Sequence, residues 1–240
     1  MREADRIGAT RAIGIALILF AIGFNLPFAW LGAHFGYPDI LRKPPGEILA
    51  AFAQGGAPLI AAWAAFAVAA LLFAPVAIGV ARVTRRPGDL SAAIAALGIG
   101  AGITQAIGLS RWVYAVPMLA AEWTASPDPA ARHVIETLFL TLHQSAGVGI
   151  GEAIGQSLTA FWLIGVALAQ QGHPRFGRRL ALLGVIAGII LLLGLVEGMA
   201  TVLAFDPGLF GVAAPLGFGL LTLWLIWTGL RCIRHPIDPE

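Results

Sequence analysis

Long apolar runs alternate with short polar stretches along the whole chain. A helix of about 20 mostly apolar residues is long enough to cross a hydrocarbon layer of ~30 Å. Runs of that length occupy residues 12–33, 57–81, 90–109, 147–170, 179–204 and 209–230. The pattern predicts an all-α polytopic membrane helix bundle of about six transmembrane helices, because helices satisfy their own backbone hydrogen bonds in lipid. With so little sequence between the spans, we expect one integral membrane domain over residues 1–240.

The two longest connections, 34–56 and 110–146, also carry helical patterns. In the first, an apolar helical face lies between Pro and Gly residues, which is typical of a short interfacial helix. In the second, Asp128 and Pro129 are suited to begin a helix that runs into the fourth span. The apolar face of the first connection consists of Ile48, Leu49 and Phe52. Four aromatic residues on the same side are typical of an interfacial aromatic belt, namely Trp30, Trp112, Tyr114 and Trp123.

Composition supports this class and charge gives an orientation. Hydrophobic residues make up 58% of the chain and charged residues 12%, which excludes an ordinary soluble domain. Basic residues gather at alternate ends of the spans, so the positive-inside rule predicts that both termini lie in the cytoplasm. The net charge of +2 therefore requires no nucleic acid partner. The basic groups contain Arg2, Arg6, Arg11, Arg82, Arg85, Arg86, Arg175, Arg178, Arg179, Arg231 and Arg234.

Two carboxylates, Glu152 and Glu197, interrupt the apolar spans. Ionisable residues inside a membrane are costly and usually face a bundle interior. At about 1.5 Å per residue, both acids and Gln105 lie roughly 9 Å from their span midpoints toward the outside, and Asn25 lies roughly 5 Å from its own. The common depth predicts an outward-facing intramembrane polar pocket. Its candidate ligand-binding residues are Glu152, Glu197, Gln105, Asn25, Gln156 and Arg111.

Such a pocket is suited to a cation or to a small or lipidic ligand, for transport or sensing. The alternative is that each acid is neutral, or paired with a residue such as Arg111, and only fixes helix packing. On an α-helix, Ser145, Glu152, Gln156 and Thr159 also share one stripe. Glycines repeat at intervals of four in the third to fifth spans, which favours close packing of those helices. These glycines include Gly98, Gly102, Gly147, Gly151, Gly155, Gly184, Gly188, Gly194 and Gly198.

Histidines on the outer side suggest a second kind of site. If 130–146 is helical, His133 and Glu136 share a face and could bind a metal together with His34. No recognised ligand spacing is completed, so capping or solvated histidines are the competing interpretation. The spans contain no histidine suited to ligate a haem, and the sequence identifies no cofactor. No catalytic motif is present, which leaves a metal-dependent membrane enzyme as an alternative without further support.

A family resemblance rests on the run "GFNLPFAWLGAHFGYPDILRKPPGEILAAFAQGG". Five further spans follow it, and the segment "HQSAGVGIGEAIGQ" enters the fourth span. The chain resembles small bacterial membrane proteins grouped as a domain of unknown function, the 4386 type. That resemblance implies a bacterial inner membrane and six helices, without an activity or catalytic residue.

The sequence leaves two classes of function beside ligand binding. The chain could be an accessory or assembly subunit of a larger membrane complex, with its small-residue faces covered by partner membrane subunits. It could also be the metal-dependent enzyme suggested by the outer histidines. In every case the lipid bilayer is the common partner.

Overall fold

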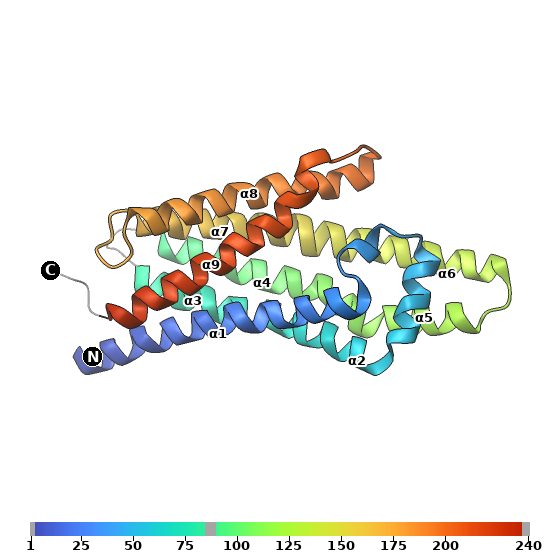
Figure 1. The fold of residues 1–240 in the computed structure, drawn as a ribbon, viewed down its shortest axis with the longest axis horizontal. Helices are drawn as coiled ribbons and strands as arrows, with labels where there is room; N and C mark the ends of the chain where they lie inside the picture. Colours follow the sequence, from blue (N-terminus) through green and yellow to red (C-terminus); the bar gives the residue numbers. More distant parts are fainter. Residues whose placement is uncertain (1–2, 85–89, 237–240) are drawn as a thin grey trace. The chain divides into compact units, whose positions relative to one another are not determined.

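A computed structural model describes residues 3–84 and 90–236, and these residues form helices joined by short turns (Figure 1). No β-strand is found in the described ranges. The elements are α1 (Glu3–Phe35), η1 (Asp39–Arg42), α2 (Pro45–Leu71), α3 (Phe73–Thr84), α4 (Ser91–Tyr114), α5 (Val116–Ala125), α6 (Pro129–Leu142), the π-helix η2 (His143–Ile154), α7 (Gly155–Gln170), α8 (Arg178–Leu203), η3 (Gly208–Val212) and α9 (Ala213–Arg234). The predicted all-α fold class is therefore confirmed.

By length and composition, six helical runs of the described chain are able to cross a membrane. The protein is thus a multi-pass membrane protein, as the apolar pattern predicted. The runs are Ala4–Phe35, Pro45–Thr84, Ser91–Ala125, Pro129–Gln170, Arg178–Ala200 and Gly208–Arg234. Several exceed the predicted spans because the two long connections are themselves helical. Asp128 caps α6 by accepting a 3.0 Å hydrogen bond from the Ala130 amide, which confirms the predicted start of that helix.

The chain divides into two compact units, each with its own hydrophobic core. Unit 1 contains Met1–Ile22, Leu72–Ile103 and Ala153–Glu240, and unit 2 contains Gly23–Leu71 and Thr104–Glu152. The single integral domain expected over residues 1–240 stays a prediction.

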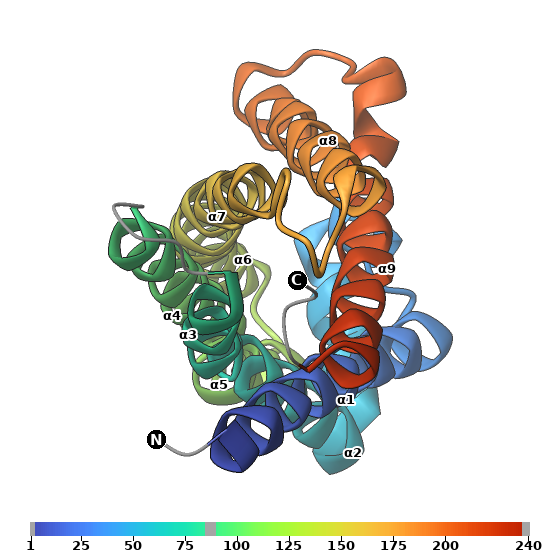
Figure 2. The ribbon, with the colours of Figure 1, turned by 90° about the vertical axis from the view of Figure 1, so that its left-hand side faces the viewer.

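Unit 1 packs large aromatic side chains against small residues. The Trp162 ring meets Phe73 edge-on at 4.7 Å and Trp224 at 5.7 Å. A Cβ added at Gly98 or at Gly184 would lie within 3.0 Å of one of these indole rings, so the glycines make room for them. Helix α7 packs against α8 (Figure 2). The Gln156 Nε2 amide donates a 2.7 Å hydrogen bond to the Leu191 carbonyl on α8.

Helices α1 and α9 cross closely inside unit 1. A Cβ at Gly14 would lie 2.6 Å from the Gly229 carbonyl oxygen, and a Cβ at Gly229 would lie 2.6 Å from the Gly14 carbonyl oxygen. Two backbones can approach this closely only because neither residue has a side chain. Figure 2 shows the two helices side by side at this crossing.

A buried arginine closes one end of unit 1. Arg175 donates hydrogen bonds to the carbonyls of Val83, His235 and Pro236 at 2.8–3.2 Å. Arg231 donates from Nε to the Arg175 carbonyl at 2.5 Å. Arg175 therefore joins three segments of the unit, in addition to any part in the orientation signal expected from the sequence.

The core of unit 2 is an aromatic stack. The rings of Trp63 and Trp112 lie 4.7 Å apart and nearly parallel, and Phe52 stacks on Trp112 at 5.6 Å. Helix α2 bends at Gly56, whose φ of 54° is accessible to glycine, and packs on α5 and α6. Ile48, Leu49 and Phe52, which were predicted to form one apolar face of a helix, are all buried in this core.

Trp123 on α5 and Glu136 on α6 make a polar contact in unit 2. Trp123 Nε1 donates a 2.9 Å hydrogen bond to Glu136 Oε1, and the Arg132 guanidinium lies over the Trp123 ring at 4.7 Å. A Cβ added at Gly46 would lie 2.7 Å from Glu136 Oε1, so the first turn of α2 presses against the same pair.

Candidate functional site

Arg111 lies near the end of α4, inside unit 2, and only 7% of its surface is exposed. Its Nη1 donates to the Gly108 carbonyl one turn earlier. Its Nη2 lies 3.3 Å from Nδ1 of His143, on the π-helix. Because a guanidinium can only donate, His143 Nδ1 accepts, and we assign the proton of a neutral ring to Nε2.

The charge of Arg111 is only partly compensated. Glu152 and, more weakly, Tyr37 interact electrostatically with the guanidinium. Its Nε is buried and has no hydrogen-bond acceptor within the described chain. Leaving a buried donor without an acceptor costs about 1–3 kcal/mol, and more for a charged group. Arg111 is therefore a buried cation with one strong donor unused.

The π-helix brings His143 and Glu152 into range of the same guanidinium. Nine residues separate them, which is two and a half turns at about 3.6 residues per turn, so an α-helix would place them on opposite faces. A π-helix, with hydrogen bonds between i and i+5, has about 4.4 residues per turn, so nine residues make just over two turns. His143 and Glu152 thus share a face of η2 (His143–Ile154).

Two glycines of the π-helix allow α4 to approach. An ideal Cβ at Gly147 would lie 2.5 Å from Nη2, 2.6 Å from Cζ and 3.0 Å from Nε of Arg111. A point this close to all three atoms lies over the flat face of the guanidinium. One turn away, an ideal Cβ at Gly151 would lie 3.1 Å from the Gly108 Cα. The glycines expected to pack closely therefore form the surface on which Arg111 lies.

The remaining surroundings of Arg111 are aromatic and contain further unused donors. Cζ lies 5.2 Å from the centre of the Trp112 ring, and His143 stacks on Phe139 at 5.8 Å. The indole nitrogens of Trp63 and Trp112 are also buried without an acceptor. Trp112 is fully buried, so it is not part of an interfacial aromatic belt as expected, whereas Tyr114 is 76% exposed.

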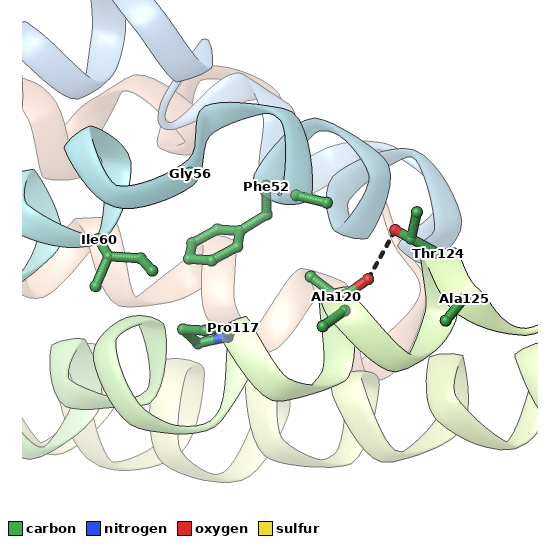
Figure 3. A pocket seen from close by; sticks show the side chains of 9 residues that line it. Phe52, Gly56, Ile60, Pro117, Ala120, Thr124 and Ala125 are labelled. Atoms are coloured by element: carbon green, nitrogen blue, oxygen red, sulfur yellow. Dashed lines mark hydrogen bonds between the residues drawn. The ribbon is translucent and has the colours of Figure 1, made fainter.

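An apolar groove lies between α2 and α5 in the same unit (Figure 3). It has a volume of about 390 Å³ and is bordered by the bend at Gly56 and by Pro117. Its polar side chain, Thr124, donates a 2.8 Å hydrogen bond to the Ala120 carbonyl. Phe52 lines the groove and stacks on Trp112, so the groove and the Arg111 site share one aromatic layer.

The candidate ligand-binding residues fall in both units. Unit 2 holds Arg111 and Glu152, together with the half-buried Asn25 and Gln105, and unit 1 holds Gln156 and the half-buried Glu197. Asn25, Gln105, Glu152 and Glu197 each have an interaction in the structure. Two members of the predicted set, Arg111 and Glu152, interact electrostatically. A site shared by Glu152 and Glu197 stays a prediction.

The polar stripe expected on the fourth span is not continuous. Ser145 and Glu152 are exposed, whereas Gln156 and Thr159 are buried. The stripe was derived with the repeat of an α-helix. Ser145 and Glu152 lie on the π-helix η2, which has more residues per turn, whereas Gln156 and Thr159 lie on α7.

The residues of the expected metal site make other contacts. His34 stacks on Trp30 at 4.3 Å and its Nδ1 lies 2.9 Å from the Trp30 carbonyl, while Glu136 accepts from Trp123. His133 is exposed on α6. Across the described residues, no group of three or more His, Cys, Asp or Glu side chains could hold a metal ion.

Sequence reasoning did not select His143, Gly147 or Tyr37 for this site. Glycine density in "HQSAGVGIGEAI" marks the contact with α4, but no residue pattern reveals π winding.

Comparison with known families gives one assignment. Residues 12–229 match the family described as "Domain of unknown function (DUF4386)". The chain belongs to this family. The match covers all six membrane-crossing runs in whole or in part, and it confirms the resemblance seen in the sequence. Neither the curated proteins nor the solved structures contain a match to this DUF4386 protein.

Proposed function

We propose that this DUF4386 protein binds a small or lipidic ligand within its membrane-embedded part, and that unit 2 holds the site. The observation that carries the proposal is the buried Arg111 guanidinium, whose Nε has no acceptor among the described residues. Buried polar groups are normally satisfied, and exceptions in native structures often mark function. A bound molecule that supplies an acceptor would satisfy this donor.

The groove between α2 and α5 supports a ligand with an apolar part. Binding sites are usually concave, largely apolar and furnished with a few polar groups, with volumes of about 300–1,000 Å³. The groove has about 390 Å³ and is lined mostly by alanine and by larger apolar side chains. A cation is the less suitable occupant of unit 2, because the Arg111 guanidinium would repel it. Transport or sensing would follow from such binding.

The test is identification of molecules that stay bound through purification. The protein is extracted in a nonionic detergent, and bound compounds are released and identified by mass spectrometry. We expect a retained compound in the wild type and its loss when Ile60→Trp fills the groove. The matched control, Ile15→Trp, changes an exposed residue of α1 in unit 1 and should retain the compound. Equal recovery from both variants, or no bound compound at all, would contradict the proposal.

The location we propose is the bacterial inner membrane, with both termini in the cytoplasm. The orientation rests on the alternating basic ends of the spans and on the even number of membrane-crossing runs in the described chain, and the bacterial inner membrane is what the family resemblance implies. Cysteines introduced at Arg82 and at Asp128 test it with a membrane-impermeant thiol reagent applied to intact cells. Labelling is expected at position 128 and absent at position 82. The reverse pattern would invert the topology.

A second candidate function is an accessory subunit of a membrane complex. It is favoured by three exposed hydroxyls at i, i+4 spacing in the fourth membrane-crossing run, Thr137, Thr141 and Ser145. Each hydroxyl donates to the carbonyl four residues earlier, so its oxygen can still accept a bond from another helix. Stoichiometric copurification of another membrane protein, lost in the triple alanine variant, would establish this function. A monodisperse protein without a partner would exclude it.

A further inference from the structure

We propose that Arg111 recognises an oxyanion, either a carboxylate or a phosphate, on the ligand of unit 2. The inference rests on the proposed function, and it names the chemical group that the site selects. It starts from Nε, the guanidinium donor that has no acceptor in the described part of the chain.

The geometry leaves one donor of the guanidinium, Nε, without an acceptor in the described part of the chain. Gly147 covers the flat face, Nη1 donates to Gly108 and Nη2 contacts His143. The N–H bonds point outward in the plane of the group, so glycine over the face does not occupy the Nε edge. The edge formed by Nε and a neighbouring nitrogen presents two parallel donors, which match the two oxygens of a carboxylate or phosphate.

The charges around Arg111 also favour an anion. Glu152 interacts electrostatically with the guanidinium, but its side chain is exposed. Tyr37 contributes a weaker electrostatic interaction, and His143 is neutral where it accepts from Nη2. A buried guanidinium carries a large desolvation cost, which a contacting oxyanion would offset.

The unused polar atoms of unit 2 are mainly donors. Buried atoms without a partner include Arg111 Nε and the indole nitrogens of Trp63 and Trp112, with Gln144 Oε1 as the acceptor among them. An oxyanion has only acceptors and can satisfy donors, whereas an ammonium group would add more donors. The surplus of hydrogen-bond donors in unit 2 and the positive charge of Arg111 therefore both favour an anionic group that only accepts hydrogen bonds.

The experiment compares three probes with the same chain and different heads: dodecanoate, dodecyl phosphate and dodecanol. Each is titrated into the delipidated wild-type protein in nonionic detergent, and bound probe is counted by native mass spectrometry. We expect one or both anions to bind at least about 10-fold more tightly than the alcohol, as charged hydrogen bonds of this kind allow. The tighter anion tells whether the natural head is a carboxylate or a phosphate.

Variants assign the difference to Arg111. Arg111→Gln should remove the advantage of the anions, and Arg111→Lys should keep only part of it, because lysine lacks the planar fork. The control Arg42→Gln removes an exposed arginine of unit 2 and should leave the advantage unchanged. If the glutamine variant does not fold, the wild-type comparison and the lysine variant decide the question.

Two failures are distinguishable. Equal binding of all three probes to the wild type would overturn the oxyanion while leaving the proposed binding function intact. An anion advantage that survives in Arg111→Lys and Arg111→Gln would also overturn it. No binding of any probe would contradict both the proposed function and the inference.

Discussion

Gly147 lies over the flat face of the Arg111 guanidinium, with its ideal Cβ position 2.6 Å from Cζ. We predict that Gly147→Ala displaces the arginine and destabilises the protein by about 1–3 kcal/mol, the usual cost of overpacking. Thermal unfolding in detergent measures the change. The control Gly23→Ala has open space in the same unit and should be neutral or slightly stabilising. Equal unfolding temperatures for Gly147→Ala and the wild type would contradict this contact.

The electrostatic link between Arg111 and Glu152 predicts non-additive mutations. In a double-mutant cycle of Arg111→Gln and Glu152→Gln, we expect a coupling energy of about 0.5 kcal/mol or more. The value should be modest and should fall with salt, because Glu152 is exposed. A matched cycle with the exposed Glu47→Gln should be additive. Additivity in both cycles would mean that the π-helix does not direct Glu152 toward Arg111.

The bond between Trp123 and Glu136 predicts a local loss of stability. Trp123→Phe removes the donor and leaves the half-buried carboxylate without it, which should cost about 1 kcal/mol or more. Tyr114→Phe, at an exposed position of the same unit, provides the control and should be neutral. Unfolding temperature and hydrogen exchange across α5 and α6 measure the effect. Unchanged exchange in Trp123→Phe would show that this hydrogen bond does not hold the two helices together.

The bond from Gln156 to the Leu191 carbonyl joins α7 and α8 in unit 1. Gln156→Leu keeps the bulk and removes the bond, so we expect destabilisation of about 0.6–2 kcal/mol, the range for hydrogen bonds between membrane helices. Ser157→Ala removes a hydroxyl that bonds only within its own helix, to Ala153, and should have less effect. Thermal unfolding distinguishes the two variants. A larger loss for Ser157→Ala than for Gln156→Leu would contradict the interhelical role.

The features that the sequence predicted correctly depend on local chemistry. Hydropathy and length determine the membrane-crossing runs, and the Asp128 side chain needs only the amide of Ala130 to cap α6. Glycine spacing predicted close backbone approach, which Gly108 and Gly151 show. These signals are read along one helix and require no knowledge of its neighbours.

The arginine site depends on information that one helix does not contain. Tryptophan is a residue type that is common in interfacial aromatic belts, yet Trp112 is buried because Trp63 and Phe52 pack against it. The π winding moves Glu152 to the face of His143, whereas any reading with 3.6 residues per turn separates them. Arg111 was selected as a candidate, but its partners could only be found once α4 and η2 lay together.

The crossing of Gly14 and Gly229 has a consequence for the connectivity of the chain. Around this point Gly14 is near Cys232 and Ile233, while Gly229 is near Ile18, so the first and last helices run in opposite directions. The beginning of α1 and the end of α9 therefore emerge from the same end of unit 1. A short peptide could join the beginning of α1 to the end of α9, and new ends could then be opened between α8 and η3. We expect such a circular permutant to insert and fold, since the contacts of unit 1 do not depend on where its chain starts.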